Sequence, residues 1–224
     1  MLICPKCKHE LVLKENAFVC REGHLYDRAK EGYVNLSLKQ KKNSGDNKLM
    51  VQARSAFLEK GYYSFLREEL ASMLETYKVH ILLDAGCGEG YYTRCFSNLV
   101  PHCFGIDLSK EAIRHAAKRD KHTLYIVSSI FACPFPDKTL DAITSIFVPP
   151  SFTEFYRLLK SNGLCFEVVP GPRHCFELKE VLYENPYENE TTKPDRKGFV
   201  CQEERNIKKT FLVKEVWELL EMTP

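Results

Sequence analysis

The segment LLDAGCGEGYYTRCF, residues 82–96, decides the fold. It opens with an apolar run that predicts a buried strand ending at Asp84, and glycines follow at positions 86, 88 and 90. The residues after the glycines suit a helix, so the segment predicts a strand, a glycine-rich turn and a helix. A turn of this kind lets a ligand approach the backbone closely, and a ligand site is therefore expected at this end of the strand.

Short apolar runs alternate with helical stretches around this segment. The runs occupy residues 80–86, 102–108, 123–129, 140–147 and 164–169, and the helical stretches occupy 91–100, 109–119 and 151–160. This alternation predicts an α/β domain with a parallel sheet covered by helices on both faces. Two helices broken near Gly61 are expected over residues 49–77. In the C-terminal part of the chain, helices are expected over 175–185 and 213–222, and a strand is expected over 199–204.

The spacing of the glycines indicates which cofactor the loop holds. The dinucleotide fingerprint is G-x-G-x-x-G, whereas Tyr91 stands here where its third glycine would be. Together with an acidic residue two positions before the first glycine, this variant resembles the loop of Rossmann-like class I methyltransferases that use S-adenosylmethionine. That cofactor has a cationic amino and sulfonium end, which a carboxylate such as Asp84 or Glu89 can balance.

Further cofactor contacts are expected at the ends of the next two strands. Asp107 ends the second strand and is placed to accept both ribose hydroxyls, although it could instead be a carboxylate at the N-terminus of the following helix. Ser129 stands where many such enzymes have an aspartate for the adenine amine, and its hydroxyl can still form a hydrogen bond. The loop itself completes the predicted set with Gly86, Gly88, Gly90, Tyr91 and Tyr92.

A cysteine cluster precedes this domain. Cys4 and Cys7 form the knuckle CPKC, and Cys20 and His24 follow twelve residues later with the spacing C-x3-H. Zinc prefers four such ligands in a tetrahedron, and with every position filled by protein the site is structural rather than catalytic. The other cysteines show no ligand pattern and are expected to fill core or loop positions.

Composition and charge narrow the class of protein. The 224 residues carry a net charge of +2, but residues 1–48 hold ten Lys and Arg against six Asp and Glu. A basic front end suggests a polyanionic partner there, with a solvated lysine-rich surface as the alternative. The start MLICPKCKHE lacks the apolar core of a secretory signal, and no apolar run reaches the length of a membrane span. A cytoplasmic protein with reduced thiols is therefore expected.

Several motifs in order resemble one family. The zinc cluster is followed by KEGYVNL, QARSAFLEKGYY, GCGEGYYT and PGPRH. In this combination, the chain resembles the 23S rRNA (guanine-N1-)-methyltransferases of the RlmA type. The resemblance implies a zinc module that grips an RNA hairpin and a domain that methylates guanine N1. It also implies that Tyr63 and His174 lie at the cofactor; without it, a buried aromatic and a solvent-facing loop residue would be the simpler interpretations.

The resemblance also implies a division of the chain. Residues 1–36 form the zinc-binding RNA-recognition module, 37–48 a basic linker, and 49–224 the methyltransferase domain, which is shorter at its C-terminus than in the family. Two modules could share one hairpin, which leaves a homodimer open. Two alternatives remain, a small-molecule methyltransferase with a structural zinc ribbon and a catalytically impaired RNA-binding module.

The acceptor side of the site offers fewer signals. Phe147, near the end of the fourth predicted strand, could stack on a base or pack in the core. Guanine N1 carries a proton until well above neutral pH, so methyl transfer requires a proton acceptor or a water path. No residue of this segment is a convincing base, and no catalytic residue is assigned.

Overall fold

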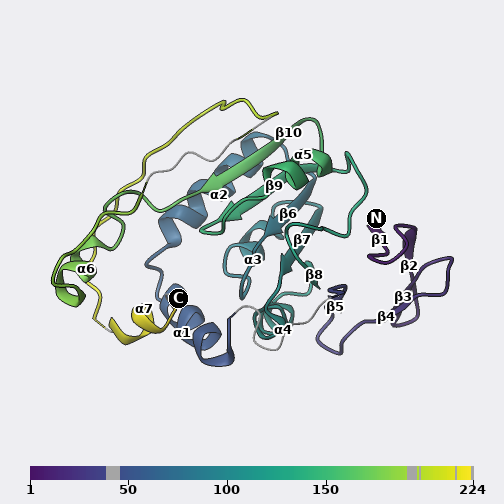
Figure 1. The fold of residues 1–224 in the computed structure, drawn as a ribbon, viewed down its shortest axis with the longest axis horizontal. Helices are drawn as coiled ribbons and strands as arrows, with labels where there is room; N and C mark the ends of the chain where they lie inside the picture. The colour runs from purple at the N-terminus through teal and green to yellow at the C-terminus, as the bar shows by residue number, and fades with distance from the viewer. Residues whose placement is uncertain (39–45, 191–195, 197, 215, 223–224) are drawn as a thin grey trace.

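The computed structural model describes residues 1–38, 46–190, 196, 198–214 and 216–222. A small antiparallel sheet comes first, in the strand order β1-β2-β3-β4. Its strands are β1 (Leu2–Ile3), β2 (Glu10–Lys14), β3 (Ala17–Val19) and β4 (Leu25–Asp27). Figure 1 shows this sheet beyond β8, on the opposite side of the molecule from α6.

The main sheet has six strands in the order β10-β9-β6-β7-β8-β5, and its neighbouring strands pair in parallel. The strands are β5 (Val34–Asn35), β6 (Ile81–Ala85), β7 (His102–Asp107), β8 (Leu124–Val127), β9 (Leu140–Ile146) and β10 (Leu159–Val168). Five of them confirm the predicted runs. The sixth, β5, was not predicted, because two residues are too short to produce a periodic signal.

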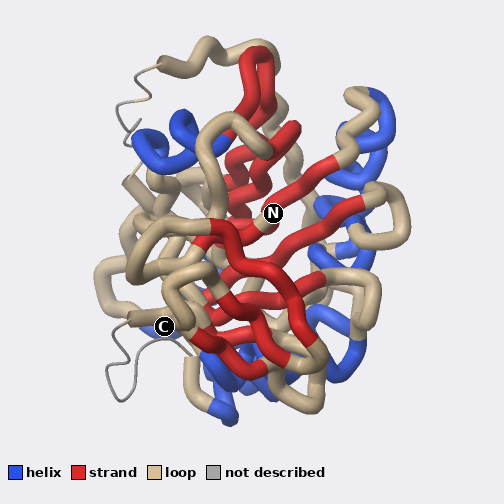
Figure 2. Tube along the Cα trace, turned by 90° about the vertical axis from the view of Figure 1, so that its right-hand side faces the viewer, coloured by secondary structure: helices blue, strands red, loops and turns tan. Residues whose placement is uncertain are grey.

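Seven helices are present among the described residues. They are α1 (Lys48–Glu59), α2 (Ser64–Thr76), α3 (Thr93–Phe96), α4 (Lys110–Arg119), α5 (Phe152–Leu158), α6 (Phe176–Leu182) and α7 (Val216–Met222). The predicted break near Gly61 separates α1 from α2. Asn47 caps α1 by accepting hydrogen bonds from the N–H groups of Leu49 and Met50. Figure 2 shows the strands running through the middle of the molecule with helices to either side.

The two faces of the main sheet are covered by different kinds of structure. Successive strand residues point to opposite faces, so Leu82 joins the buried cluster of α2, and Leu83 joins a cluster that contains Leu11 and Phe18 of the small sheet. On the second face, α5 packs against the main sheet. Residues 128–139, which connect β8 to β9, form no helix. The small sheet covers this region in place of a second helix.

One segment outside the main sheet differs from its predicted structure. The strand predicted over 199–204 is wrong, because these residues form no strand and Val200 is 80% exposed. Without a buried face, so short an apolar run has nothing to hold it in a sheet. The basic linker predicted over 37–48 lies largely outside the described residues, and Lys48 already begins α1. None of the helices described here is both long enough and apolar enough to cross a membrane.

Candidate functional site

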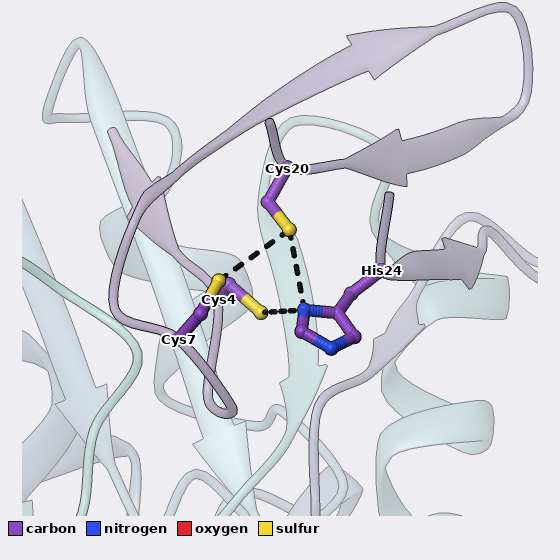
Figure 3. Close-up of side chains that lie close together, drawn as sticks. All are labelled: Cys4, Cys7, Cys20 and His24. Carbon is purple, nitrogen blue, oxygen red and sulfur yellow. Dashed lines mark hydrogen bonds between the residues drawn. The ribbon is translucent and has the colours of Figure 1, made fainter. Parts of the chain in front are cut away.

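The cysteine cluster comes together as its spacing predicts. The ligand atoms of Cys4, Cys7, Cys20 and His24 all lie within 4.8 Å of one another (Figure 3). Two tight turns present them: the N–H of Lys8 donates to the carbonyl of Cys4, and the N–H of Gly23, at φ +77°, donates to that of Cys20. Each turn aims its side chains into the space between the knuckles.

The spacing of these atoms fits a tetrahedral zinc ion. Bonds of about 2.3 Å to sulfur and about 2.0 Å to nitrogen place tetrahedral ligand atoms roughly 3.5–3.8 Å apart. The Nδ1 atom of His24 lies 3.5 Å from Sγ of Cys4 and 3.4 Å from Sγ of Cys20, and Sγ of Cys7 lies 3.5 Å from that of Cys20. The four residues therefore match the donor set and the size of a structural zinc site.

Tyr26 adds an outer contact that the sequence did not suggest. Its hydroxyl lies 3.2 Å from Sγ of Cys4. Burial raises the pKa of the Cys4 thiol, but the hydrogen bonds from Tyr26 and from the backbone of Cys7 and Lys6 outweigh it and lower that pKa to about 6. A thiolate is the form that binds zinc, so the hydroxyl of Tyr26 favours the binding state of this ligand.

The glycine loop turns sharply between β6 and α3. Gly86, Gly88 and Gly90 all have positive φ, at +79°, +54° and +85°. At Gly90 a Cβ atom would lie 2.8 Å from both the Cβ of Ala116 and the hydroxyl of Tyr125, so the third glycine is also required by packing. The loop thus passes close against α4 and β8 and leaves its backbone directed at the end of the sheet.

Asp107 ends β7 beside this loop. One carboxylate oxygen accepts the N–H of Gly88 at 3.0 Å, and the other accepts the N–H of Ser109 at 2.7 Å. Ser109, not Asp107, caps α4, with its hydroxyl accepting the N–H of Ala112. The alternative in which Asp107 serves the helix N-terminus is therefore not needed, and burial raises the pKa of its carboxyl against these hydrogen bonds. Each oxygen still has a lone pair available for a hydroxyl.

The two acidic residues of the loop have different surroundings. Asp84 is buried beneath the loop, where it accepts hydrogen bonds from Thr93 at 2.5 Å and Thr144 at 2.8 Å. Burial raises its pKa to about 6. Glu89 is also buried, and its pKa rises to about 7 although Arg54 and Arg119 oppose the shift. Asp84 is thus engaged by the protein itself, and Glu89 is the freer of the two carboxyl groups.

The threonines that hold Asp84 were missed by sequence reasoning. Thr93 follows the loop and Thr144 lies in β9, sixty residues from Asp84. Neither belongs to a motif, and a strand threonine is common. Only the pairing of β6 with β9, which sets Asp84 opposite Thr144, reveals the contact.

Two tyrosines after the loop carry unpaired polar groups. The hydroxyls of Tyr91 and Tyr92 are buried and have no hydrogen-bond partner within the described part of the chain. A buried polar atom without a partner is costly, and its presence in a native site indicates a ligand or water that satisfies it. These hydroxyls, the carboxylates of Glu89 and Asp107 and the backbone of the loop provide hydrogen-bond donors and acceptors that suit the polar groups of S-adenosylmethionine.

The remaining predicted residues lie on both sides of the loop. Ser129 follows β8, one strand beyond Asp107, and its hydroxyl accepts the N–H of Phe131 at 3.2 Å. Tyr63 precedes α2 and is buried, and its hydroxyl lies 3.1 Å from Nε2 of His174. His174 is half-buried and is not the solvent-facing loop residue of the simpler interpretation.

A separate cavity of about 570 Å³ opens at the opposite edge of the sheet. It is lined by the amino-terminal ends of β6, β7 and β10, including His80, His102 and Lys160. None of the predicted site residues lines it. Ligands of open α/β sheets bind at the carboxyl ends of the strands, which is where the glycine loop and Asp107 lie.

Comparison with known proteins agrees with this geometry. Residues 2–45 match the family described as "RlmA, N-terminal", a zinc ribbon, and residues 83–166 match the family described as "Methyltransferase domain". Among solved structures, YcgJ of Bacillus subtilis is 27% identical with a TM-score of 0.42, over 51% of this chain and 56% of that one. The fold is that of class I methyltransferases, which use S-adenosylmethionine, with an N-terminal zinc ribbon.

Two curated relatives identify the family. YxjB of Bacillus subtilis, assigned as a 23S rRNA (guanine-N(1)-)-methyltransferase, is 33% identical over 82% of this chain and 69% of its own length. The 23S rRNA (guanine(748)-N(1))-methyltransferase of Streptomyces fradiae is 30% identical over 81% of this chain and 67% of its own. The chain thus spans about two thirds of the length of these relatives. It belongs to the family of 23S rRNA (guanine-N1-)-methyltransferases.

Proposed function

We propose that this protein transfers a methyl group from S-adenosylmethionine to N1 of a guanine in a hairpin of 23S rRNA. The observation that carries the proposal is the presence of two features on one core, a four-ligand zinc cluster and a glycine loop that is hydrogen-bonded to Asp107. Family membership favours this function over a small-molecule methyltransferase and over a module that only binds RNA.

The cofactor residues take distinct roles in this proposal. The bound cofactor supplies an electrophilic methyl group on a sulfonium. Asp107 accepts hydrogen bonds from the ribose hydroxyls, and the Ser129 hydroxyl forms a hydrogen bond with the adenine. Glu89 balances the cationic end, and Asp84 holds the loop through Thr93 and Thr144. The backbone of the loop glycines gives further contacts to the cofactor, from Gly86, Gly88 and Gly90. Side chains around the loop give the rest, from Tyr91, Tyr92, Tyr63 and His174.

The zinc module provides a second surface for the RNA. A hairpin is too large to be held by a base pocket alone, and zinc bound by Cys4, Cys7, Cys20 and His24 makes a small sheet rigid. The basic side chains of this module would contact phosphates, and they are Lys6, Lys8, Lys14, Arg21, Arg28 and Lys30. The module positions the hairpin, and the pocket reads the base.

The division into a zinc module over residues 1–36, a linker over 37–48 and a methyltransferase domain from residue 49 follows from these two roles. A ribosomal substrate implies action in the cytoplasm. The homodimer stays a prediction, and light scattering of the protein alone and with the hairpin tests it: a doubled mass supports the dimer, and a single mass in both samples contradicts it.

Primer extension on unmethylated 23S rRNA tests the proposed function. A methyl group on guanine N1 blocks Watson–Crick pairing, so reverse transcriptase stops one nucleotide before the modified base. A new stop in a hairpin loop that requires S-adenosylmethionine supports the proposal. Intact cofactor binding without any stop would contradict it, and transfer of labelled methyl to a small acceptor would favour the alternative enzyme.

A further inference from the structure

Three side chains meet where β9 and β10 end. The ring of Tyr63 lies 5.8 Å from that of Phe147 and 6.2 Å from that of His174, and the rings of Phe147 and His174 lie 5.5 Å apart. They come from three distant segments, the residue before α2, the end of β9 and the loop after β10. No motif predicts this cluster as a unit.

The cluster lies on the acceptor side of the sheet. Strand order reverses beside β6, so β7 and β8 continue to one side and β9 and β10 to the other. A ligand of such a sheet lies outside the carboxyl ends of the strands at this reversal. The groups expected to hold the cofactor's ribose and adenine follow β7 and β8, which leaves the ends of β9 and β10 to face the molecule that receives the methyl group.

Phe147 is held in a conformation that favours glycine. Its φ is +57°, its N–H donates to the carbonyl of Val168 at 3.0 Å, and its side chain is 39% exposed. A left-handed conformation at a bulky residue costs energy and persists where the surrounding structure enforces it, often at a functional site. Here it keeps a partly exposed aromatic ring beside His174.

His174 has one ring nitrogen in use and one free. Nε2 lies 3.1 Å from the Tyr63 hydroxyl, and Nδ1 forms no hydrogen bond within the described part of the chain. The charged or titratable groups around the ring are the hydroxyl of Tyr63, which also interacts with the thiol of Cys175, and the ammonium of Lys179. Burial and then Lys179 lower the pKa of His174, so it is neutral near pH 7, and burial raises that of Tyr63, so its hydroxyl stays protonated.

We infer that Nδ1 of His174 accepts the N1 proton of the target guanine, while Tyr63 orients the imidazole and Phe147 stacks on the base. This rests on the proposed function. The N1–H bond breaks as its proton passes to Nδ1, and the electron pair left on N1 forms the bond to the methyl carbon. The carbon–sulfur pair leaves with sulfur as S-adenosylhomocysteine, and the imidazolium then releases its proton to water.

The test compares three variants of the full chain on a 23S rRNA fragment. His174→Gln keeps polarity and size but cannot accept the proton, Tyr63→Phe removes only the hydroxyl, and His102→Gln is a matched control at the far edge of the sheet. Single-turnover methylation is followed against pH with saturating cofactor. Binding of S-adenosylhomocysteine is measured by calorimetry.

The expected result separates proton transfer from cofactor binding. His174→Gln should slow methylation at neutral pH by about 10²- to 10⁴-fold, the usual contribution of a positioned base. Its rate should recover as rising pH ionises guanine N1, whereas the wild-type rate should be level above the His174 pKa. Because the cofactor is saturating, the slow rate of His174→Gln should persist whatever the change in its cofactor affinity, and His102→Gln should match the wild type in both rate and affinity. Tyr63→Phe should slow the reaction less and keep the wild-type pH profile.

Two results overturn the inference. One is a His174→Gln protein with the wild-type pH profile, and the other is loss of cofactor affinity with the rate preserved at saturating cofactor. If His174→Gln folds poorly, an unchanged rate in Tyr63→Phe overturns it instead. A wild-type protein that methylates no guanine N1 overturns the proposed function and this inference together, so the two failures are distinguishable.

Discussion

At the scale of single residues, the site is built from buried carboxyl groups with different tasks. Asp84 is held by two threonines beneath the loop, and Asp107 spans the loop and the start of α4 with one hydrogen bond to each. Both carboxyl pKa values are raised by burial. The positions of both residues were predicted from the sequence, but their partners were not, because those are side chains of α3 and β9 and backbone groups that belong to no motif.

Replacing Asp107 with alanine should weaken binding of S-adenosylhomocysteine by about 10- to 100-fold, since hydrogen bonds to a charged group contribute about 1.5–3 kcal/mol. Zinc content should not change, because the cluster lies in a different sheet. Calorimetry and metal analysis measure the two quantities. Asp137→Ala, at an exposed ion pair with Arg157, is the control. Equal cofactor affinity in Asp107→Ala and wild type would refute the ribose role.

Replacing Asp84 with asparagine should change how stability depends on pH. The folded pKa of about 6 lies above the ordinary 3.8, so the folded protein binds this proton more tightly than the unfolded chain. Stability from this group is therefore present below about pH 4 and is lost as pH rises to about 6, by on the order of 3 kcal/mol. Asparagine has no such titration.

Urea unfolding of both proteins at several pH values measures this effect. Because the other titrating groups are common to both, the stability of Asp84→Asn relative to wild type should improve as pH rises from about 4 to 7. A relative stability that does not vary with pH would show that Asp84 is not buried as a neutral acid.

At the scale of elements, the glycine loop joins β6 to α3 under tight packing. Gly61 and Gly90 have almost the same φ, at +84° and +85°, but a Cβ at Gly61 meets nothing within 4 Å. The two positions thus separate backbone strain from steric contact. A sequence pattern identifies both as turn residues and cannot tell which of them is crowded.

Gly90→Ala should therefore destabilise the protein more than Gly61→Ala. The backbone term of about 1 kcal/mol is common to both, and overpacking against Ala116 and Tyr125 should add about 1–3 kcal/mol at Gly90. Thermal unfolding measures the difference, and calorimetry should show weaker cofactor binding in Gly90→Ala alone. Equal unfolding temperatures in the two variants would contradict the packing argument.

At the scale of the whole molecule, the zinc module is part of the main core. Its residues Leu2, Leu11 and Phe18 share one buried cluster with Leu83 and Ile126 of the parallel sheet. The N–H of Ile3 also donates to the carbonyl of Pro134 in the connection between β8 and β9. The surface proposed to hold RNA is consequently fixed to the sheet that carries the glycine loop.

Cys20→Ser should release zinc and weaken hairpin binding more than cofactor binding. Because the module covers one face of the sheet, loss of the metal should also lower the unfolding temperature of the whole protein. Metal analysis, filter binding of the hairpin and calorimetry measure these effects. Cys201→Ser, at an exposed cysteine, is the matched control. Hairpin affinity that survives loss of the metal would refute the clamp.

The sequence by itself determined the features that depend on neighbours along the chain. The zinc spacing, the glycine turn at residues 86–90 and the five main strands are of this kind, because ligand spacing, turn chemistry and periodicity are local. The family resemblance also led to Tyr63 and His174 as separate site residues.

Only the tertiary structure decided how these parts meet. It set β5 at the edge of the main sheet, packed the zinc module against one face of that sheet, and paired Tyr63 with His174 across 111 residues. Local patterns report the conformation of a segment and which face is buried, but not which distant segment buries it. Phe147 is the clearest case, since its left-handed backbone follows from the strand ends that enclose it and not from its own preference.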